Sequence, residues 1–171
     1  DPSVQMFGEQ IPSGWSTYDF TCPNLGCFSN NNGGNSVTVL DVTHHMHGAG
    51  RLMRTRLYDE NDNLYKELTT DWYDFNFQDY VRTEPFEFLP GTHASVECVY
   101  ESTGETFGLG SDNEMCMTFL VYYPASSTDL RFCGYRNGDT GFGSTCTNNT
   151  TPTPTIHGST MPDISWQTFS T

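Results

Sequence analysis

Short segments with alternating apolar and polar side chains are the feature that most constrains the fold of this chain. They cover residues 3–8, 15–21, 36–47, 51–58, 64–68, 86–89, 94–100 and 114–123, and clusters of Gly, Pro, Asn, Asp and Ser separate them. A period of two residues is typical of strands, and no segment keeps a helical period of 3.6 residues. The pattern therefore predicts an all-β fold, an antiparallel β-sandwich of the jelly-roll type.

The domain organisation follows from length and from a change of composition near the C-terminus. A chain of 171 residues can build one well-packed domain, which we expect over residues 1–146. Residues 147–171 are rich in Thr and Pro and predict an extended stalk or tail. Apolar side chains in this tail could instead dock onto the domain: Ile156, Ile164, Trp166 and Phe169.

The charge balance excludes two classes of partner. The sequence holds 7 Lys plus Arg against 21 Asp plus Glu, a formal net charge of −14. Nucleic acids and anionic membrane surfaces require clustered positive charge, so neither is expected as the main partner. No apolar run approaches the roughly 18 residues of a membrane span.

Six cysteines predict three disulfides, because they are even in number, widely spaced and contain no Cys-x-x-Cys pair. Spacing alone does not choose among the possible pairings. Asn148 and Asn149 begin two overlapping glycosylation sequons, of which one is expected to carry a glycan. Disulfides and sequons together indicate an extracellular or secretory location.

The candidate functional feature is the pair His45 and His47, which follows the alternating run 37–42. On a strand, residues two apart share a face, so the two imidazoles would lie side by side and could hold one metal ion. His44 and Met46 would point the opposite way. The alternative interpretation is a pair of surface histidines near the end of a strand.

Five motifs follow one another along the chain: His45-Met46-His47-Gly48-Ala49-Gly50-Arg51, Asp74-Phe75-Asn76-Phe77-Gln78, Pro90-Gly91, Cys98 and Glu114-Met115-Cys116. In this order and approximate spacing they resemble one family, the C-terminal domain of the copper type II, ascorbate-dependent monooxygenases, to which dopamine β-hydroxylase and peptidylglycine α-hydroxylating monooxygenase belong. The resemblance implies a jelly-roll sandwich in which His45, His47 and Met115 bind copper and act in catalysis. It also implies three disulfides: Cys98–Cys116, Cys22–Cys133 and Cys27–Cys146.

The same resemblance implies a function: this domain would activate dioxygen and hydroxylate a C–H bond. A second copper domain, absent from this sequence, would supply an electron, with ascorbate as the reductant. Two positions depart from the peptide-hydroxylating branch, because Thr43 replaces a carboxylate-binding Arg and Phe119 replaces a substrate-contacting Tyr. A non-catalytic extracellular module that binds copper or assembles with another protein is the alternative, and the sequence leaves enzymatic activity open.

Overall fold

The computed structural model describes residues 8–22, 36–81, 83–89, 91–125 and 155–157 of the chain. Strands and one short 3-10 helix make up the regular structure of these residues. In chain order they are β1 (Gly14–Cys22), β2 (Val37–His45), β3 (Gly50–Tyr58), β4 (Leu64–Asp71), the 3-10 helix η2 (Phe75–Phe77), β5 (Phe86–Phe88), β6 (His93–Ser102), β7 (Met117–Tyr123) and β8 (Thr155–His157). The predicted all-β class is confirmed.

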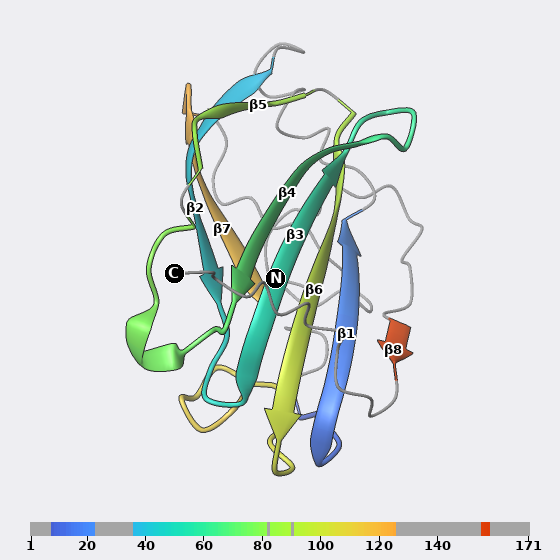
Figure 1. Cartoon of the computed structure of the whole chain (residues 1–171), viewed down its shortest axis with the longest axis vertical. Coiled ribbons are helices and arrows are strands. Elements are labelled where there is room, and N and C mark those ends of the chain that lie inside the picture. The colour runs from blue at the N-terminus through green and yellow to red at the C-terminus, as the bar shows by residue number, and fades with distance from the viewer. Residues whose placement is uncertain (1–7, 23–35, 82, 90, 126–154, 158–171) are drawn as a thin grey trace, which may run out of the picture.

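Two antiparallel sheets form a sandwich. One sheet has the strand order β4-β3-β6-β1-β8 and the other the order β5-β2-β7. Figure 1 shows the larger sheet nearer the viewer, with β2 and β7 in the layer behind it. Neighbouring strands in each sheet pair antiparallel, so the predicted disulfide-linked, antiparallel β-sandwich is confirmed.

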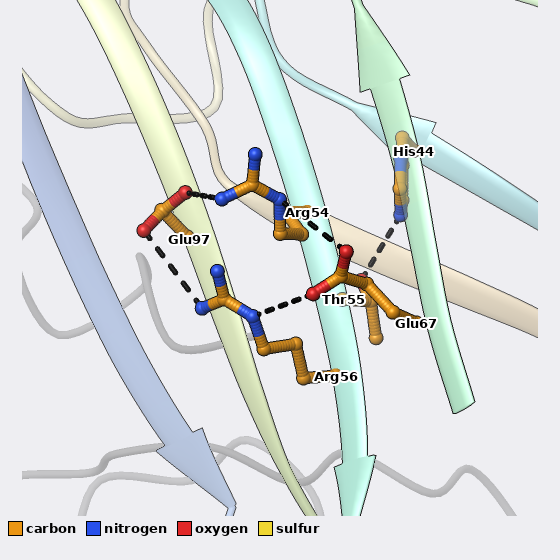
Figure 2. A network of polar contacts seen from close by, with 6 residues as sticks. All are labelled: His44, Arg54, Thr55, Arg56, Glu67 and Glu97. Atoms are coloured by element: carbon orange, nitrogen blue, oxygen red, sulfur yellow. Dashed lines mark hydrogen bonds and ion pairs between the residues drawn. The ribbon is translucent and has the colours of Figure 1, made fainter. Parts of the chain in front are cut away.

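Strand β3 shows why the sequence alternates. Met53, Thr55 and Leu57 are buried, whereas Arg54 and Arg56 between them face outward. The two arginines form a closed ring of ion pairs with Glu67 on β4 and Glu97 on β6, at N···O distances of 2.9 to 4.0 Å. Figure 2 shows this ring lying across three strands. Cross-strand opposite charges of this kind favour the observed pairing of β3 with both neighbours.

The interior of the sandwich holds two groups of buried apolar residues. The first, which we call the site-end core, comprises Ile11, Tyr18, Phe20, Met46, Ala49, Met53, Tyr73, Cys98, Tyr100, Phe107 and Cys116. The second, the far core, comprises Val37, Val39, Val42, Leu57, Leu68, Phe88 and Ala94. A disulfide joins Cys98 to Cys116 inside the site-end core.

The ends of some elements differ from the sequence prediction. The histidine strand was expected to run through residue 47 but ends at His45, and the strand expected from residue 114 begins at Met117. The turn expected at 59–63 is present, because Asp59 Oδ1 accepts hydrogen bonds from the backbone N–H groups of Asn61 and Asn63. In the part of the chain that the structure describes, no helix is long and apolar enough to span a membrane.

Several predictions fall on other parts of the chain. The expected strand at 3–8, except Gly8, lies outside the described residues, as do Asn148, Asn149 and most of the expected tail. Within that tail, β8 includes Ile156 and pairs with residues 17–19 of β1. The expected disulfides Cys22–Cys133 and Cys27–Cys146 also remain predictions, since only the backbone of Cys22 is described.

Candidate metal centre

The two histidines singled out in the sequence lie side by side at the end of β2. His45 is the last residue of the strand and His47 follows two residues later, with their ring centroids 5.0 Å apart. His47 is buried and His45 is half-buried. Between them, Met46 points into the site-end core, so the predicted alternation of faces continues past the end of the strand.

The side chain of Gln78, just after η2, determines the tautomer of His45. Gln78 Nε2 donates to the Phe75 carbonyl oxygen at 2.9 Å, which leaves its Oε1 facing Nδ1 of His45. An amide oxygen only accepts hydrogen bonds, so Nδ1 of His45 carries the proton. Its Nε2 then presents a lone pair. Burial lowers the pKa of His45, which favours this neutral form.

His47 has the same tautomer for an independent reason. Its Nδ1 lies 2.7 Å from the backbone carbonyl oxygen of Asn113, which can only accept. Nε2 of His47 therefore also presents a lone pair. A histidine whose Nδ1–H is held by an oxygen acceptor is oriented to bind a metal through Nε2.

Met115 lies on the chain segment that leads into β7. The pairing of β2 with β7 ends at His45 opposite Met117, and an extension of this register by two residues would place Met115 opposite His47. The two residues just before Met115 agree with this extension, because both Asn113 and Glu114 contact His47 directly. Met115 is buried, and its carbonyl oxygen accepts a hydrogen bond from the Tyr100 hydroxyl at 2.7 Å.

Glu114 is the supporting residue whose role the sequence did not reveal. Its side chain is 1% exposed, and its two carboxylate oxygens accept the backbone N–H groups of His47 at 2.9 Å and Ala49 at 2.6 Å. Burial raises its pKa, while these two N–H donors act in the opposite direction by stabilising the charged form. The sequence signals were its position at the start of an apolar run and its place in the family motif Glu114-Met115-Cys116.

Aromatic side chains border the two histidines. The ring of Phe75 lies 5.2 Å from that of His47, and the ring of Phe119 lies 6.2 Å from that of His45. The aromatic segment 71–80 therefore does two things: Tyr73 packs into the site-end core, while Phe75 borders the site. Phe119 and Thr43 are direct cross-strand partners, so the two departures from the peptide-hydroxylating branch lie together next to His45.

His44 and His93 have other partners. His44 is 2% exposed, with Nδ1 2.8 Å from Thr70 Oγ1 and Nε2 3.0 Å from Thr55 Oγ1, and Figure 2 shows it approaching Thr55 from the core side of β3. Both of its ring nitrogens are engaged, so His44 is not placed as a third ligand. His93 pairs with Asp62 at 3.1 Å beside the turn at 59–63.

The buried position of His44 predicts acid sensitivity. Burial lowers the pKa of His44 from 6.5 to about 4, so between these values the unfolded state binds a proton that the folded state does not. Stability is then full above pH 6.5 and decreases as the pH falls toward 4. We expect the metal-free protein to lose about 2 kcal/mol of unfolding free energy from this group between pH 7.5 and pH 5.

Urea unfolding of chelator-treated protein at both pH values measures this loss. The His44→Leu variant, which cannot bind the proton, should show a pH dependence smaller than that of the wild type by the same amount. An equal pH dependence in both proteins would show that His44 is not the group responsible.

The described residues contain no group of three or more His, Cys, Asp or Glu side chains that could hold a metal ion. The candidate donors are the two adjacent imidazoles and the thioether of Met115, on the segment whose residues Asn113 and Glu114 contact His47. This set fits copper, because imidazole suits both oxidation states and a soft thioether favours Cu(I).

Comparison with known proteins identifies a family for this chain. Residues 9–145 match the family described as copper type II ascorbate-dependent monooxygenase, C-terminal domain. The chain is 36% identical over 94 residues to mouse "DBH-like monooxygenase protein 1", covering 52% of this chain and 15% of that protein. It is 40% identical over 97 residues to human "Putative DBH-like monooxygenase protein 2", covering 53% of this chain and 19% of that protein.

A more distant relative is the "Tyramine beta-hydroxylase" of Caenorhabditis briggsae, 26% identical over 99 residues, which are 55% of this chain and 17% of that protein. In each case the matched region is less than a fifth of the relative's length. The family match, by contrast, covers most of the chain and includes both histidines and Met115. This chain therefore belongs to the family of copper type II ascorbate-dependent monooxygenase C-terminal domains.

Proposed function

We propose that His45 Nε2, His47 Nε2 and Met115 Sδ bind one copper ion, and that this domain is the dioxygen-activating, C–H-hydroxylating half of a two-copper monooxygenase. The observation that supports it most directly is the shared tautomer of the histidines. Because Gln78 and Asn113 each accept an Nδ1–H, two Nε2 lone pairs are available in adjacent rings. Preorganised donors of this kind lower the cost of binding a metal.

The chain's own residues set the conditions at this centre. When bound, copper would supply a Cu(I)/Cu(II) couple carrying one electron at a time, together with an open coordination position. The hydrogen bonds to Gln78 and Asn113 hold the imidazoles in place and increase their basicity. Phe75 and Phe119 give the site apolar walls. Thr43 beside Phe119 offers no positive charge, so a carboxylate-bearing peptide is not the expected substrate.

Hydroxylation by dioxygen needs more electrons than one copper ion stores. The domain would therefore need a second source of electrons. We propose a second copper-binding domain as the partner and ascorbate as the reductant, in an extracellular or secretory compartment. The description of the family as a C-terminal domain supports this arrangement. The small fraction of each relative that this chain covers supports it as well.

The role of the thioether gives a direct test. Met115→Ala should weaken Cu(I) binding by roughly tenfold or more and Cu(II) binding much less, because a soft sulfur ligand favours the lower oxidation state. Competition with Cu(I)- and Cu(II)-selective chelators measures both constants. Met117→Ala is the matched control, since Met117 lies two residues after Met115, at the start of β7 and opposite His45. If only Met117→Ala lost Cu(I) affinity, Met117 and not Met115 would be the sulfur ligand.

A non-catalytic copper-binding or assembly module is the alternative, and the absence of the carboxylate-binding Arg, which is Thr43 here, is compatible with it as well as with a different substrate. Oxygen uptake separates the two functions. It is measured on the copper-loaded chain with ascorbate, first alone and then with a separately expressed second copper domain of a family member. Catalysis requires uptake that depends on the second domain and disappears in His45→Ala. If the chain binds one equivalent of copper but shows no such oxygen uptake, the non-catalytic module is the correct function.

A further inference from the structure

The segment that carries the two histidines is not held by strand pairing. The ladder between β2 and β7 ends at His45 opposite Met117, so Met46 has no strand partner. Its two backbone groups bind one side chain instead. The N–H of Met46 donates to the Tyr73 hydroxyl at 2.9 Å, and that hydroxyl donates to the Met46 carbonyl oxygen at 2.6 Å.

Four further backbone groups of this segment bind residues from other parts of the chain or from the start of β3. Glu114 accepts the N–H groups of His47 and Ala49, Arg51 donates to the Gly48 carbonyl oxygen at 2.9 Å, and the Glu101 N–H donates to the Ala49 carbonyl oxygen at 2.9 Å. Of these contacts, the one at Met46 is placed midway between the two histidines. Any rotation of the Met46 backbone changes the direction of one imidazole relative to the other.

The chain adopts an unfavourable backbone conformation next to Tyr73. Strand β4 ends at Asp71, and Trp72 then takes a φ of +60°, which is uncommon for a bulky residue. The Tyr73 N–H donates to the Arg51 carbonyl oxygen at 2.8 Å, and the ring enters the site-end core with 6% exposure. A strained residue persists only where the surrounding contacts determine its conformation. Here the strained Trp72 directly precedes Tyr73, whose hydroxyl binds the Met46 backbone.

Gly50 restricts Met46 from the opposite side. A Cβ atom at position 50 would lie 2.7 Å from Met46 Cβ and 3.1 Å from its sulfur, so the glycine leaves space for the observed side chain. Met46 is completely buried between this glycine and the core. Both its backbone and its side chain are therefore fixed.

We propose that Tyr73 is a positioning residue that sets the relative orientation of His45 and His47 before copper binds. The inference rests on the proposed copper site. Tyr73 would act through the backbone of Met46, which its hydroxyl binds on both polar groups. Its hydroxyl is the functional group, because the ring alone would fill the core equally well.

The variant Tyr73→Phe removes the hydroxyl and keeps the ring. We expect its Cu(I) affinity to fall by roughly tenfold, a typical effect of removing a group that orients metal ligands, with one equivalent still bound. The electron paramagnetic resonance spectrum of the Cu(II) form should resolve more than one copper geometry. Tyr65→Phe is the matched control, since Tyr65 loses a hydrogen bond to Thr92 at 2.8 Å and packs against the far core. Its copper affinity and spectrum should equal those of the wild type.

Gly50→Ala tests the same restraint without altering Tyr73 and should also broaden the distribution of copper geometries. Wild-type affinity and a single Cu(II) spectrum in Tyr73→Phe would overturn the inference, as would equal losses in Tyr65→Phe. If Tyr73→Phe does not fold, an unchanged Cu(II) spectrum in folded Gly50→Ala would overturn it instead. Failure of the wild-type chain to bind one equivalent of copper would overturn the proposed function and the inference together.

Discussion

Glu114→Ala is expected to reduce the unfolding free energy by about 3–5 kcal/mol, the largest effect of any substitution considered for this domain. The variant leaves the N–H groups of His47 and Ala49 buried without acceptors, and each such group costs about 1–3 kcal/mol. It also leaves a cavity where a side chain with 1% exposure was packed. Urea unfolding of the metal-free protein measures the loss.

Two further variants isolate the cause. Glu114→Gln keeps the shape but turns one acceptor oxygen into a donor, so it should cost roughly 1–3 kcal/mol. Glu101→Ala removes an exposed carboxylate that pairs with Arg51 at 3.1 Å and should cost at most about 1 kcal/mol. A glutamine variant as stable as the wild type would mean that the two N–H bonds do not account for the role of Glu114.

Removing the Cys98–Cys116 disulfide is expected to reduce the unfolding free energy by about 3 kcal/mol. The bond closes a loop with a sequence separation of 18 residues, and the linkage restricts the unfolded chain. The double variant Cys98→Ala/Cys116→Ala, compared with the wild type by urea unfolding under non-reducing conditions, gives this value without disturbing the other cysteines. A loss below about 1 kcal/mol would show that the fold holds these strands without the covalent bond.

The same double variant has a second expected effect at the metal centre. Met115 lies directly before Cys116, and Tyr100 holds the Met115 carbonyl oxygen from β6. Without the disulfide, that segment is attached to β6 by fewer bonds, so Cu(I) affinity should decrease more than Cu(II) affinity. Chelator competition at a urea-free condition, where both proteins are folded, separates this effect from the loss of stability.

The parts of the fold that depend on local residues were predictable from the sequence. The alternation along β3 is visible in the sequence because the charged Arg54 and Arg56 flank Thr55. The turn at 59–63 is predictable because the short side chain of Asp59 can bind backbone N–H groups a few residues further on. His45 and His47 were identifiable as a pair for the same reason, since two residues apart on an extended chain share a face. Each of these inferences needs only neighbouring residues.

The limits of β2 and β7 depended on residues far along the chain and could not be predicted in this way. Strand β2 ends two residues earlier than expected because Tyr73 and Glu114 bind the backbone of Met46 and His47 in place of a strand. These residues are separated from Met46 and His47 by 27 and 67 positions, and no periodicity reports such a contact. The prediction that Met115 is a third ligand rests only on the family resemblance.

The ion-pair ring on β3, β4 and β6 affects how charged molecules meet this domain. Arg54 and Arg56 are each held between Glu67 and Glu97, so these two cations are neutralised within the sheet and do not attract anions in solution. The rest of the surface carries the whole excess of negative charge, −14 for the chain. Ascorbate is itself an anion at neutral pH, so its direct collision with this domain is electrostatically disfavoured, and most strongly at low salt. A partner domain that is reduced by ascorbate at its own surface, and passes the electron on through a protein interface, would avoid that repulsion.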